Sequence, residues 1–154
     1  MKTVDAPIHA LSVDVEDWYQ GIEIPAERWP EFERRLAPAM DKLLGLLDER
    51  GVRATFFVLG VVAEEHPEVV RRIAEVGHEV ATHGYSHEKL YRMTPERFRG
   101  ELRRSVRRLE DLCGTRVIGH RAAYFSITES SLWALDVLAE EGILYDSSIQ
   151  PVYN

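Results

Sequence analysis

The chain has 154 residues, of which 45% are hydrophobic and 29% charged, and its formal net charge is −7. This length and composition suit one folded domain with its own core and exclude intrinsic disorder. The single cysteine excludes an internal disulfide, and the acidic balance argues against a general nucleic-acid-binding protein.

The amino-terminal residues contain no apolar segment of the kind that a secretory signal requires. No stretch of the chain approaches the roughly 20 consecutive apolar residues that cross a bilayer. We therefore expect a protein that does not insert into a membrane and stays in the cytoplasm. Its oligomeric state is not predicted by any sequence pattern.

Short apolar runs alternate with segments of helical periodicity along the chain. The apolar runs predict five strands, at residues 8–15, 54–60, 78–83, 117–121 and 143–145. Apolar residues at steps of three and four predict helices around residues 40–47, 69–73, 94–112 and 132–138. Thr94 can cap the longest helix, with Pro95 in its first turn and Gly114 after its last.

Strands that alternate with helices of this length predict right-handed βαβ units and a parallel sheet. The chain has room for about five such units, whereas a full eight-stranded barrel needs roughly 250 residues. The predicted class is therefore α/β, either an open doubly wound sheet or part of a barrel.

Functional groups of parallel α/β folds gather at the carboxyl ends of the strands. Asp14, at the end of the first predicted strand, and Glu16 and Asp17 just after it are three carboxylates that repel one another unless a cation or proton relieves them. On an extended backbone Asp14 and Glu16 point the same way. This pattern indicates a metal ligand beside a general base, or else a solvated acidic loop.

His83 ends the third predicted strand, and His87 follows it four residues later. On one face of a helical turn both imidazoles can reach one ion, and Gly84 lets the backbone bend close to it. The alternative is a polar loop in which the histidines are incidental.

Arg121 is at the end of the fourth predicted strand, and Asp146 follows the fifth. Arg121 can grip a carboxylate with two hydrogen bonds or form an ordinary surface salt bridge, and Asp146 can cap a turn. All these polar groups fall on the same rim of the sheet. Two histidines and one carboxylate leave an open position, as in catalytic zinc sites, and a second carboxylate can then serve as base.

From about residue 11 to residue 149 the chain resembles the polysaccharide deacetylase family, also called the NodB-homology domain or carbohydrate esterase family four. Residues 12–18 resemble the variant first motif of bacterial exopolysaccharide-type members, and residues 82–87 resemble the second motif. Residues 121–124 resemble the third motif, with Ala123 where proline is expected, and Asp146 resembles the fourth.

The resemblance implies a distorted or incomplete (β/α) barrel and a divalent metal, with zinc favoured. Members whose first motif has two acids two residues apart place the base first, which makes Asp14 the base and Glu16 the ligand. Asp17 competes with Glu16 for this role. His83 and His87 would be the other two ligands.

The activity implied by the resemblance is removal of N-acetyl groups from amino sugars of a bacterial polysaccharide. Arg121 would pair with Asp14, and the backbone N–H of Tyr124 would help to hold the oxyanion. Asp146 would help to position the general acid. The partner would be an N-acetylated oligo- or polysaccharide, bound by the rings of Trp18 and Tyr124.

The family supplies a late histidine as general acid after further strands, and no such segment is present in these 154 residues. Residues 1–154 are therefore expected to be the N-terminal part of a longer deacetylase domain, without its C-terminal strands. Two other interpretations stay open: a non-catalytic carbohydrate-binding or interaction domain on the same scaffold, and a C–N hydrolase of small amides.

The helix after Thr94 is rich in arginine. Its arginines are Arg97, Arg99, Arg103, Arg104, Arg107 and Arg108, and its glutamates include Glu96, Glu101 and Glu110. We expect a solvated outer face with ion pairs between neighbouring turns, although such a face could also bind an anionic polymer.

Overall fold

A computed structural model describes residues 9–150 of the chain. One parallel sheet runs through it, made of β1 (Ser12–Val15), β2 (Thr55–Val58), β3 (Glu79–Thr82), β4 (Gly119–His120) and β5 (Tyr145–Asp146). The strand order is β1-β2-β3-β4-β5, so every strand pairs with its neighbour in the sequence. This confirms the α/β prediction and selects the incomplete barrel over a doubly wound sheet, whose order would reverse. Residue 8 of the first predicted strand lies outside the described residues.

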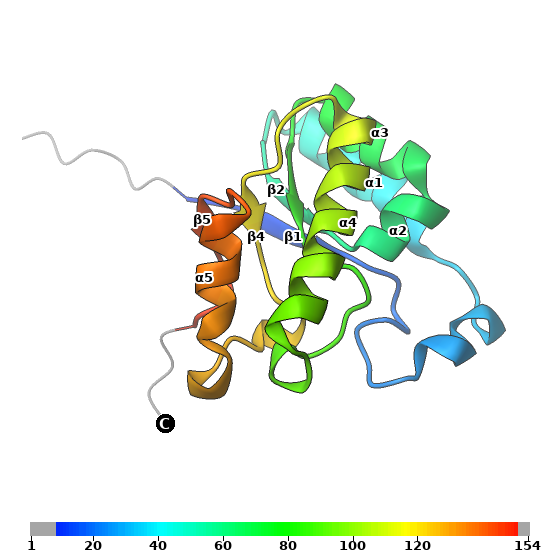
Figure 1. Ribbon diagram of the computed structural model, residues 1–154. Coiled ribbons are helices and arrows are strands. Elements are labelled where there is room, and N and C mark those ends of the chain that lie inside the picture. Colours follow the sequence, from blue (N-terminus) through cyan, green and yellow to red (C-terminus); the bar gives the residue numbers. More distant parts are fainter. Residues whose placement is uncertain (1–8, 151–154) are drawn as a thin grey trace, which may run out of the picture.

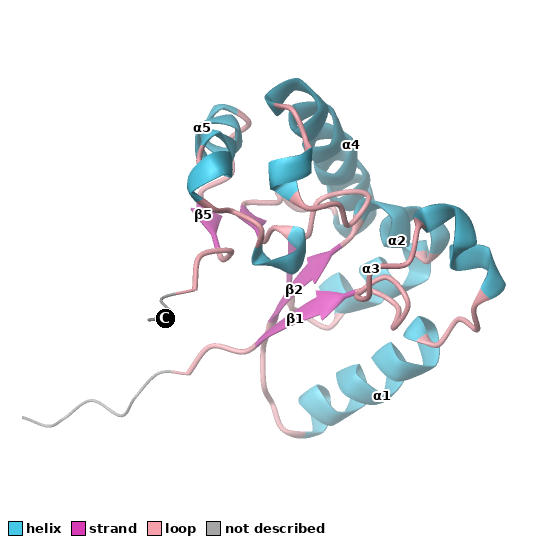
Figure 2. Ribbon diagram, turned by 90° about the horizontal axis from the view of Figure 1, so that it is seen from below, coloured by secondary structure: helices cyan, strands magenta, loops and turns pink. Residues whose placement is uncertain are grey.

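Five α-helices connect and flank the strands. They are α1 (Leu36–Glu49), α2 (Gly60–Glu65), α3 (Pro67–Glu75), α4 (Pro95–Cys113) and α5 (Trp133–Glu140). Figures 1 and 2 show them in an arc outside the strands, with α1 at one end and α5 at the other. The longest of them, α4, is too polar to cross a bilayer, and no other helix within residues 9–150 is long and apolar enough to do so.

The longest helix, α4, has the boundaries and the inward face that its sequence predicts. Its fully buried positions follow steps of three and four, at Phe98, Leu102, Ser105 and Leu109. Thr94 Oγ1 accepts a hydrogen bond from the Arg97 backbone N–H at 3.3 Å, which caps the first turn. Gly114 ends the helix with φ 68°, a left-handed conformation that glycine adopts without strain.

The hydrophobic core fills the space between the sheet and the helices. β2 lies at its centre, because Phe56, Phe57 and Val58 are all buried on one side or the other. One cluster packs β2 against α1, α2 and α3, and a second packs α4 against α5. The polar residues that are buried lie mostly at the carboxyl ends of the strands, which sets that edge apart from the rest of the core.

Two features differ from the expected elements. Gly60 begins α2 instead of ending a strand, and this helix has only six residues, too few to show a helical period. The long connection between β1 and α1 has no apolar periodicity, and within it residues Ala26–Glu31 form a 3-10 helix. This connection matters for function because it borders the carboxyl edge of the sheet.

Candidate metal centre

The register of the sheet brings together side chains that are far apart in the sequence. Val15 pairs with Val58, Val58 with Thr82, and Thr82 with His120. The residues that follow these strands therefore meet at one edge, as the sequence predicts.

Glu16, His83 and His87 form a cluster with the composition of a metal site. One ligand atom from each lies within 4.8 Å of the other two. His87 Nε2 lies 2.8 Å from Glu16 Oε2, yet this buried oxygen has no partner with hydrogen-bond geometry among residues 9–150. A buried oxygen without a hydrogen bond, facing two imidazoles, fits a divalent cation such as zinc, with a coordination position left open for a substrate atom.

His83 is oriented by the backbone of the neighbouring strand. Its Nδ1 lies 2.8 Å from the carbonyl oxygen of Arg121, which can only accept, so Nδ1 carries the proton and Nε2 faces the cluster. Burial lowers the pKa of His83 to about 4, against the opposing attraction of Asp14. The imidazole is therefore neutral at pH 7, the form that binds a metal.

Asp14 lies beside the cluster and is held by Arg121. Arg121 Nη1 donates to Asp14 Oδ1 at 2.7 Å, while Asp14 Oδ2 lies 4.0 Å from His83 Nε2. The guanidinium is itself fixed, because its Nη2 donates to the hydroxyls of Ser12 at 2.9 Å and Ser147 at 2.8 Å. One carboxylate oxygen is thus occupied and the other faces the histidines.

The neighbouring carboxylate, Asp17, serves a different purpose. Its Oδ2 accepts hydrogen bonds from the backbone N–H groups of Arg35 at 2.8 Å and Leu36 at 3.1 Å. Its Oδ1 accepts from the N–H of Trp18 at 2.9 Å. Asp17 therefore caps the amino terminus of α1, where a negative charge is favourable, and its oxygens are not part of the cluster.

Asp146 is joined to a histidine outside the cluster. Its Oδ2 lies 2.7 Å from His120 Nδ1 and accepts from the Ser148 hydroxyl at 2.8 Å, while Oδ1 accepts from the Ser148 N–H at 2.8 Å. Burial alone would raise the pKa of Asp146, but the hydrogen bonds from His120 and Ser148 outweigh it and the pKa is lowered. The structure places Asp146 beside His120 rather than beside the triad of Glu16, His83 and His87.

Strained backbone is concentrated at this edge of the sheet. Within residues 9–150, positive φ outside glycine occurs at His87 (56°), Tyr124 (55°) and Phe125 (51°). The rings of His87 and Tyr124 have centroids 4.5 Å apart. Such conformations persist only where surrounding contacts impose them, and they cluster at functional sites.

The two histidines reach each other through a loop, not through the helical turn that their spacing suggests. Residues 83–89 have no helical structure. The backbone N–H of Gly60, at the start of α2, donates to the carbonyl of Gly84 at 2.9 Å, and Ser105 Oγ donates to the same carbonyl at 3.0 Å. Gly84 itself has φ 78°. The loop is therefore held by α2 and α4.

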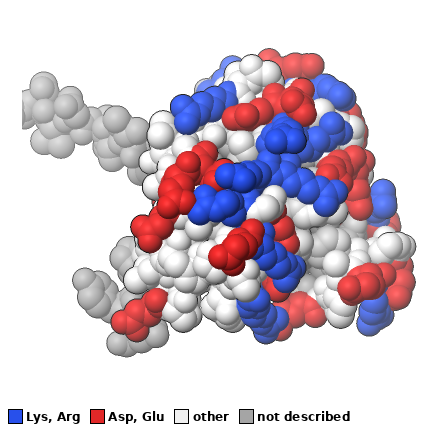
Figure 3. Space-filling view, in the orientation of Figure 1, with Lys and Arg blue, Asp and Glu red and all other residues white. Residues whose placement is uncertain are grey.

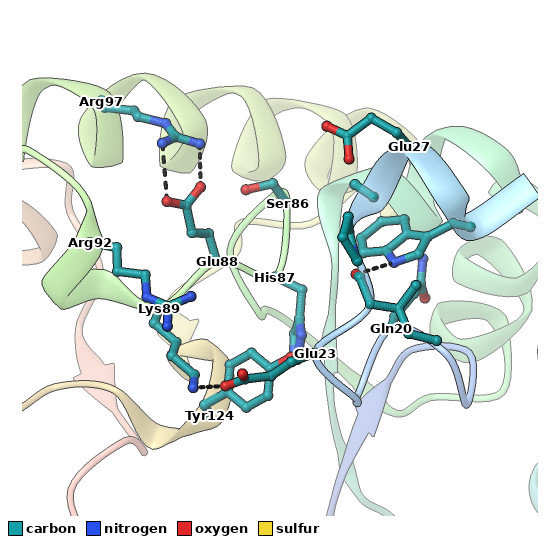
Figure 4. A pocket seen from close by; sticks show the side chains of 14 residues that line it. Gln20, Glu23, Glu27, Ser86, His87, Glu88, Lys89, Arg92, Arg97 and Tyr124 are labelled. Atoms are coloured by element: carbon teal, nitrogen blue, oxygen red, sulfur yellow. Dashed lines mark hydrogen bonds and ion pairs between the residues drawn. The ribbon is translucent and has the colours of Figure 1, made fainter.

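Beside His87 lies an open pocket of about 450 Å³ (Figure 4). Tyr124 and Trp29 contribute aromatic surface to it, and Lys89 lies over the Tyr124 ring at 4.8 Å. Trp18 does not line this pocket. Its indole N–H donates to the carbonyl of Glu33 at 3.0 Å, and its ring packs edge-on against neighbouring aromatic residues.

Two residues that border the site, Trp29 and Gly21, carry no signal in the sequence. Trp29 lies in the aperiodic connection before α1, where no pattern indicates which side chains face the pocket. A Cβ added at Gly21 would lie 2.9 Å from Glu16 Oε1. Only the absence of a side chain there lets the Glu16 carboxylate occupy its position.

Comparison with known proteins identifies the family. The sequence model of the family described as polysaccharide deacetylase matches residues 31–142, a range that contains His83, His87 and Arg121. A peptidoglycan-N-acetylglucosamine deacetylase of Bacillus cereus is 31% identical over 118 residues, which cover 69% of this chain and 43% of that protein. A chitooligosaccharide deacetylase of Bradyrhizobium sp. is 35% identical over 97 residues, which cover 63% and 42%.

Comparison of the fold with solved structures points to the same family. A Mycobacterium smegmatis crystal structure, whose name places it with the polysaccharide deacetylases, matches with a TM-score of 0.77 and 34% identity. The match covers 91% of this chain and 50% of that one. The chain thus spans about half the length of the proteins that it matches. Because the family's sequence model accounts for more than half of it, this chain belongs to the polysaccharide deacetylase family.

Proposed function

We propose that this chain forms the metal-binding part of a site that removes N-acetyl groups from the amino sugars of a bacterial polysaccharide. In this proposal Glu16, His83 and His87 hold a zinc ion and Asp14 is the general base. The observation that carries the proposal is the convergence of these three ligands, within 4.8 Å of one another, beside the Asp14–Arg121 pair.

A divalent cation held by this triad supplies a Lewis acid that polarises the acetyl carbonyl and makes a water molecule more acidic. Asp14 accepts the proton of the attacking water through Oδ2, the oxygen that Arg121 leaves free. Arg121 orients the base through its hydrogen bond to Oδ1. The backbone N–H of Tyr124 is assigned to the oxyanion of the tetrahedral intermediate.

The substrate proposed is an N-acetylated oligo- or polysaccharide. The pocket beside His87 offers about 450 Å³ and two aromatic residues, Tyr124 and Trp29, whose rings can stack against sugar faces. Relatives named for action on peptidoglycan and on chitooligosaccharides support this class of substrate. Trp18 lies outside this pocket, and its partly exposed ring would contact the sugar beyond it. Asp146 bonds His120, and its expected role in positioning the general acid concerns a residue that these 154 residues do not supply.

Zinc binding is tested separately from turnover. We expect one zinc ion per chain in competition titrations against a chelator, and loss of this stoichiometric uptake in His83→Ala and in His87→Ala. His9→Ala is the matched control, because His9 is exposed, and it should bind zinc as the unmodified chain does. Full uptake by both triad variants would remove the metal site from the proposal.

Acetate release from N-acetylglucosamine oligomers, with zinc present, tests the reaction in a longer chain that also carries the late histidine of the family. Asp14→Asn should bind zinc normally and lose about 100-fold or more of the rate, the usual contribution of a general base. Asp41→Asn, at an exposed ion pair with Arg72, should change neither. If that longer chain, loaded with zinc, binds oligomers without releasing acetate, the carbohydrate-binding alternative is favoured. Release from small amides alone would favour the amide hydrolase.

A further inference from the structure

The two histidines of the triad differ in what supports them. A histidine that binds a metal through one nitrogen almost always donates its other N–H to a carbonyl, a carboxylate or a water. His83 follows this rule, with Nδ1 on the carbonyl of Arg121 at 2.8 Å. His87 has Nε2 toward Glu16, but its Nδ1 is buried and has no hydrogen-bond partner within the described part of the chain. A partner for this N–H has to come from the surroundings of His87.

A third buried histidine, His120, has the opposite deficiency. Its Nδ1 donates to the Asp146 carboxylate at 2.7 Å, because an ionised carboxylate only accepts. The neutral ring then carries a lone pair on Nε2. This atom is also buried and without a hydrogen-bond partner among residues 9–150. The reaction proposed above uses neither His120 nor Asp146.

The unpaired donor and the unpaired acceptor border the same space. His87 and His120 both line a small cavity of about 10 Å³ behind the triad, walled on other sides by apolar residues such as Leu90, Met93 and Phe98. That volume, measured as space for the centre of a water, is close to the ~10–15 Å³ that one water molecule needs. Ser86 and Glu101 also line it, and they already bond each other at 2.7 Å.

We propose that His120, held by Asp146, positions the metal ligand His87 through one ordered water that accepts from His87 Nδ1–H and donates to His120 Nε2. This inference rests on the proposed role of His87 as a ligand. The linkage fixes the tautomer of His87, with the proton on Nδ1 and the lone pair of Nε2 directed at the cation. It also gives Asp146 a function that its sequence position alone does not reveal.

Several contacts hold the Asp146–His120 end of this linkage in one position. Ser148 donates its hydroxyl proton to Asp146 at 2.8 Å, and the same hydroxyl oxygen accepts from the N–H of Ala122 at 2.7 Å. The ring of His120 also packs edge-on against Phe98, with centroids 5.7 Å apart. His120 is therefore held from β5 and from α4, so that its Nε2 keeps one direction.

The first measurement uses zinc-loaded protein without substrate, where catalysis plays no part. NMR of the histidine rings should show the His87 Nδ1–H as a downfield, hydrogen-bonded signal. In His120→Phe, which keeps a planar ring but removes the group that holds the water, this signal should move upfield because its hydrogen bond weakens. An unchanged His87 Nδ1–H signal in this variant would overturn the inference.

The second measurement is zinc affinity. His120→Phe should bind zinc about 10- to 100-fold more weakly, as is usual when the outer partner of a ligand is lost. Asp146→Asn should weaken binding in the same direction, and His120→Gln, which keeps an acceptor, should recover part of the affinity. His78→Phe is the matched control, because His78 is buried and its Nε2 also lacks a partner among the described residues, yet it does not line the cavity.

The outcomes separate this inference from the proposed function. If the unmodified chain takes up no zinc, the proposed function fails and the inference fails with it. If zinc binding requires His87 but is equal in His120→Phe and His78→Phe, only the inference is wrong. A high-resolution crystal structure with a water between the two rings would support it, and a direct contact between them or a dry cavity would contradict it.

Discussion

At the scale of single residues, Gly21 determines where the Glu16 carboxylate lies. Gly21→Ala would place a Cβ 2.9 Å from Glu16 Oε1, and the flexible carboxylate end would have to move. We expect zinc affinity to fall about tenfold, as it does when a ligand loses its support, with little change in the free energy of unfolding. Zinc titration and urea unfolding measure the two effects.

Gly45→Ala is the control for this substitution, because nothing lies within 4 Å of a Cβ added there. It should raise stability by roughly 0.5–1 kcal/mol, as alanine does in a helix interior, and leave zinc affinity unchanged. Equal zinc affinity in Gly21→Ala and the unmodified chain would show that Glu16 is not a ligand at this position.

Asp17 provides the complementary test. Asp17→Ala removes the acceptor of three backbone N–H groups, two of them at the start of α1. We expect a loss of about 2 kcal/mol of unfolding free energy, in the upper range for a helix cap, with one zinc still bound per chain. A variant of full stability that no longer binds zinc would make Asp17 the ligand instead of Glu16.

Glu16 and Asp17 show which roles of single residues can be predicted from the sequence and which cannot. Asp14, Glu16, His83, His87 and Arg121 could be assigned to one rim because the carboxyl ends of parallel strands meet there. The choice between Glu16 and Asp17 depends on hydrogen bonds to amides 18 and 19 residues further along the chain. No local pattern encodes such contacts. In the same way, no local pattern indicates that Trp29 lines the pocket beside His87 and that Trp18 does not.

At the scale of elements, the short helix α2 supports the loop that carries both histidines. A Cβ at Gly60 would lie 2.4 Å from Tyr85 Cδ2, so the Tyr85 ring would have to move. Gly60→Ala should therefore cost roughly 1–3 kcal/mol of unfolding free energy, as overpacking does, and weaken zinc binding. Thermal unfolding and zinc titration check both, with Gly100→Ala, in open space on α4, as control. Normal zinc binding in Gly60→Ala would show that the loop does not depend on α2.

The boundaries of helix α4 could be predicted from the sequence, but most of its ion pairs could not. Its cap, its inward face and its glycine stop follow from local sequence, and all three are confirmed. One ion pair of the kind expected between neighbouring turns is present, Arg97–Glu101 at 3.3 Å. Other arginines pair outside the helix: Arg99 and Arg103 with Glu141 beyond α5, and Arg104 with Glu64 of α2. The positive surface visible in Figure 3 is therefore largely tied to adjacent acidic groups that only the tertiary fold brings near.

At the scale of the whole molecule, the stability of the metal-free chain should depend on pH through His83. Its pKa in the folded chain is about 4, below the ordinary 6.5, because burial disfavours the charged ring. Between these two pH values the unfolded chain binds a proton that the folded chain does not. Stability should therefore fall as pH drops from about 6.5 to 4, by up to about 1.4 kcal/mol per pH unit.

Urea unfolding of the metal-free chain at several pH values between 4.5 and 7.5 measures this dependence. His83→Gln should have a smaller slope in the same range, because glutamine does not titrate. Equal slopes for the two proteins would show that His83 is not buried in neutral form.

More of the overall architecture than of the candidate metal site could be predicted from the sequence. Alternating strands and helices predict a parallel sheet, and the chain length excludes a complete barrel. The consecutive strand order, β1 to β5, then follows the barrel pattern. What could not be predicted lies in segments without periodicity, above all the connection between β1 and α1, whose conformation is set by tertiary contacts.

The proposed reaction depends most on the identity of the metal ligands. The most direct measurement is a crystal structure of the chain grown with zinc, with the ion located by anomalous scattering at the zinc edge. We expect one ion bound by Glu16, His83 and His87 at about 2.0–2.2 Å, with both histidines coordinating through Nε2. An ion bound elsewhere, or one that lacks either histidine, would contradict the account.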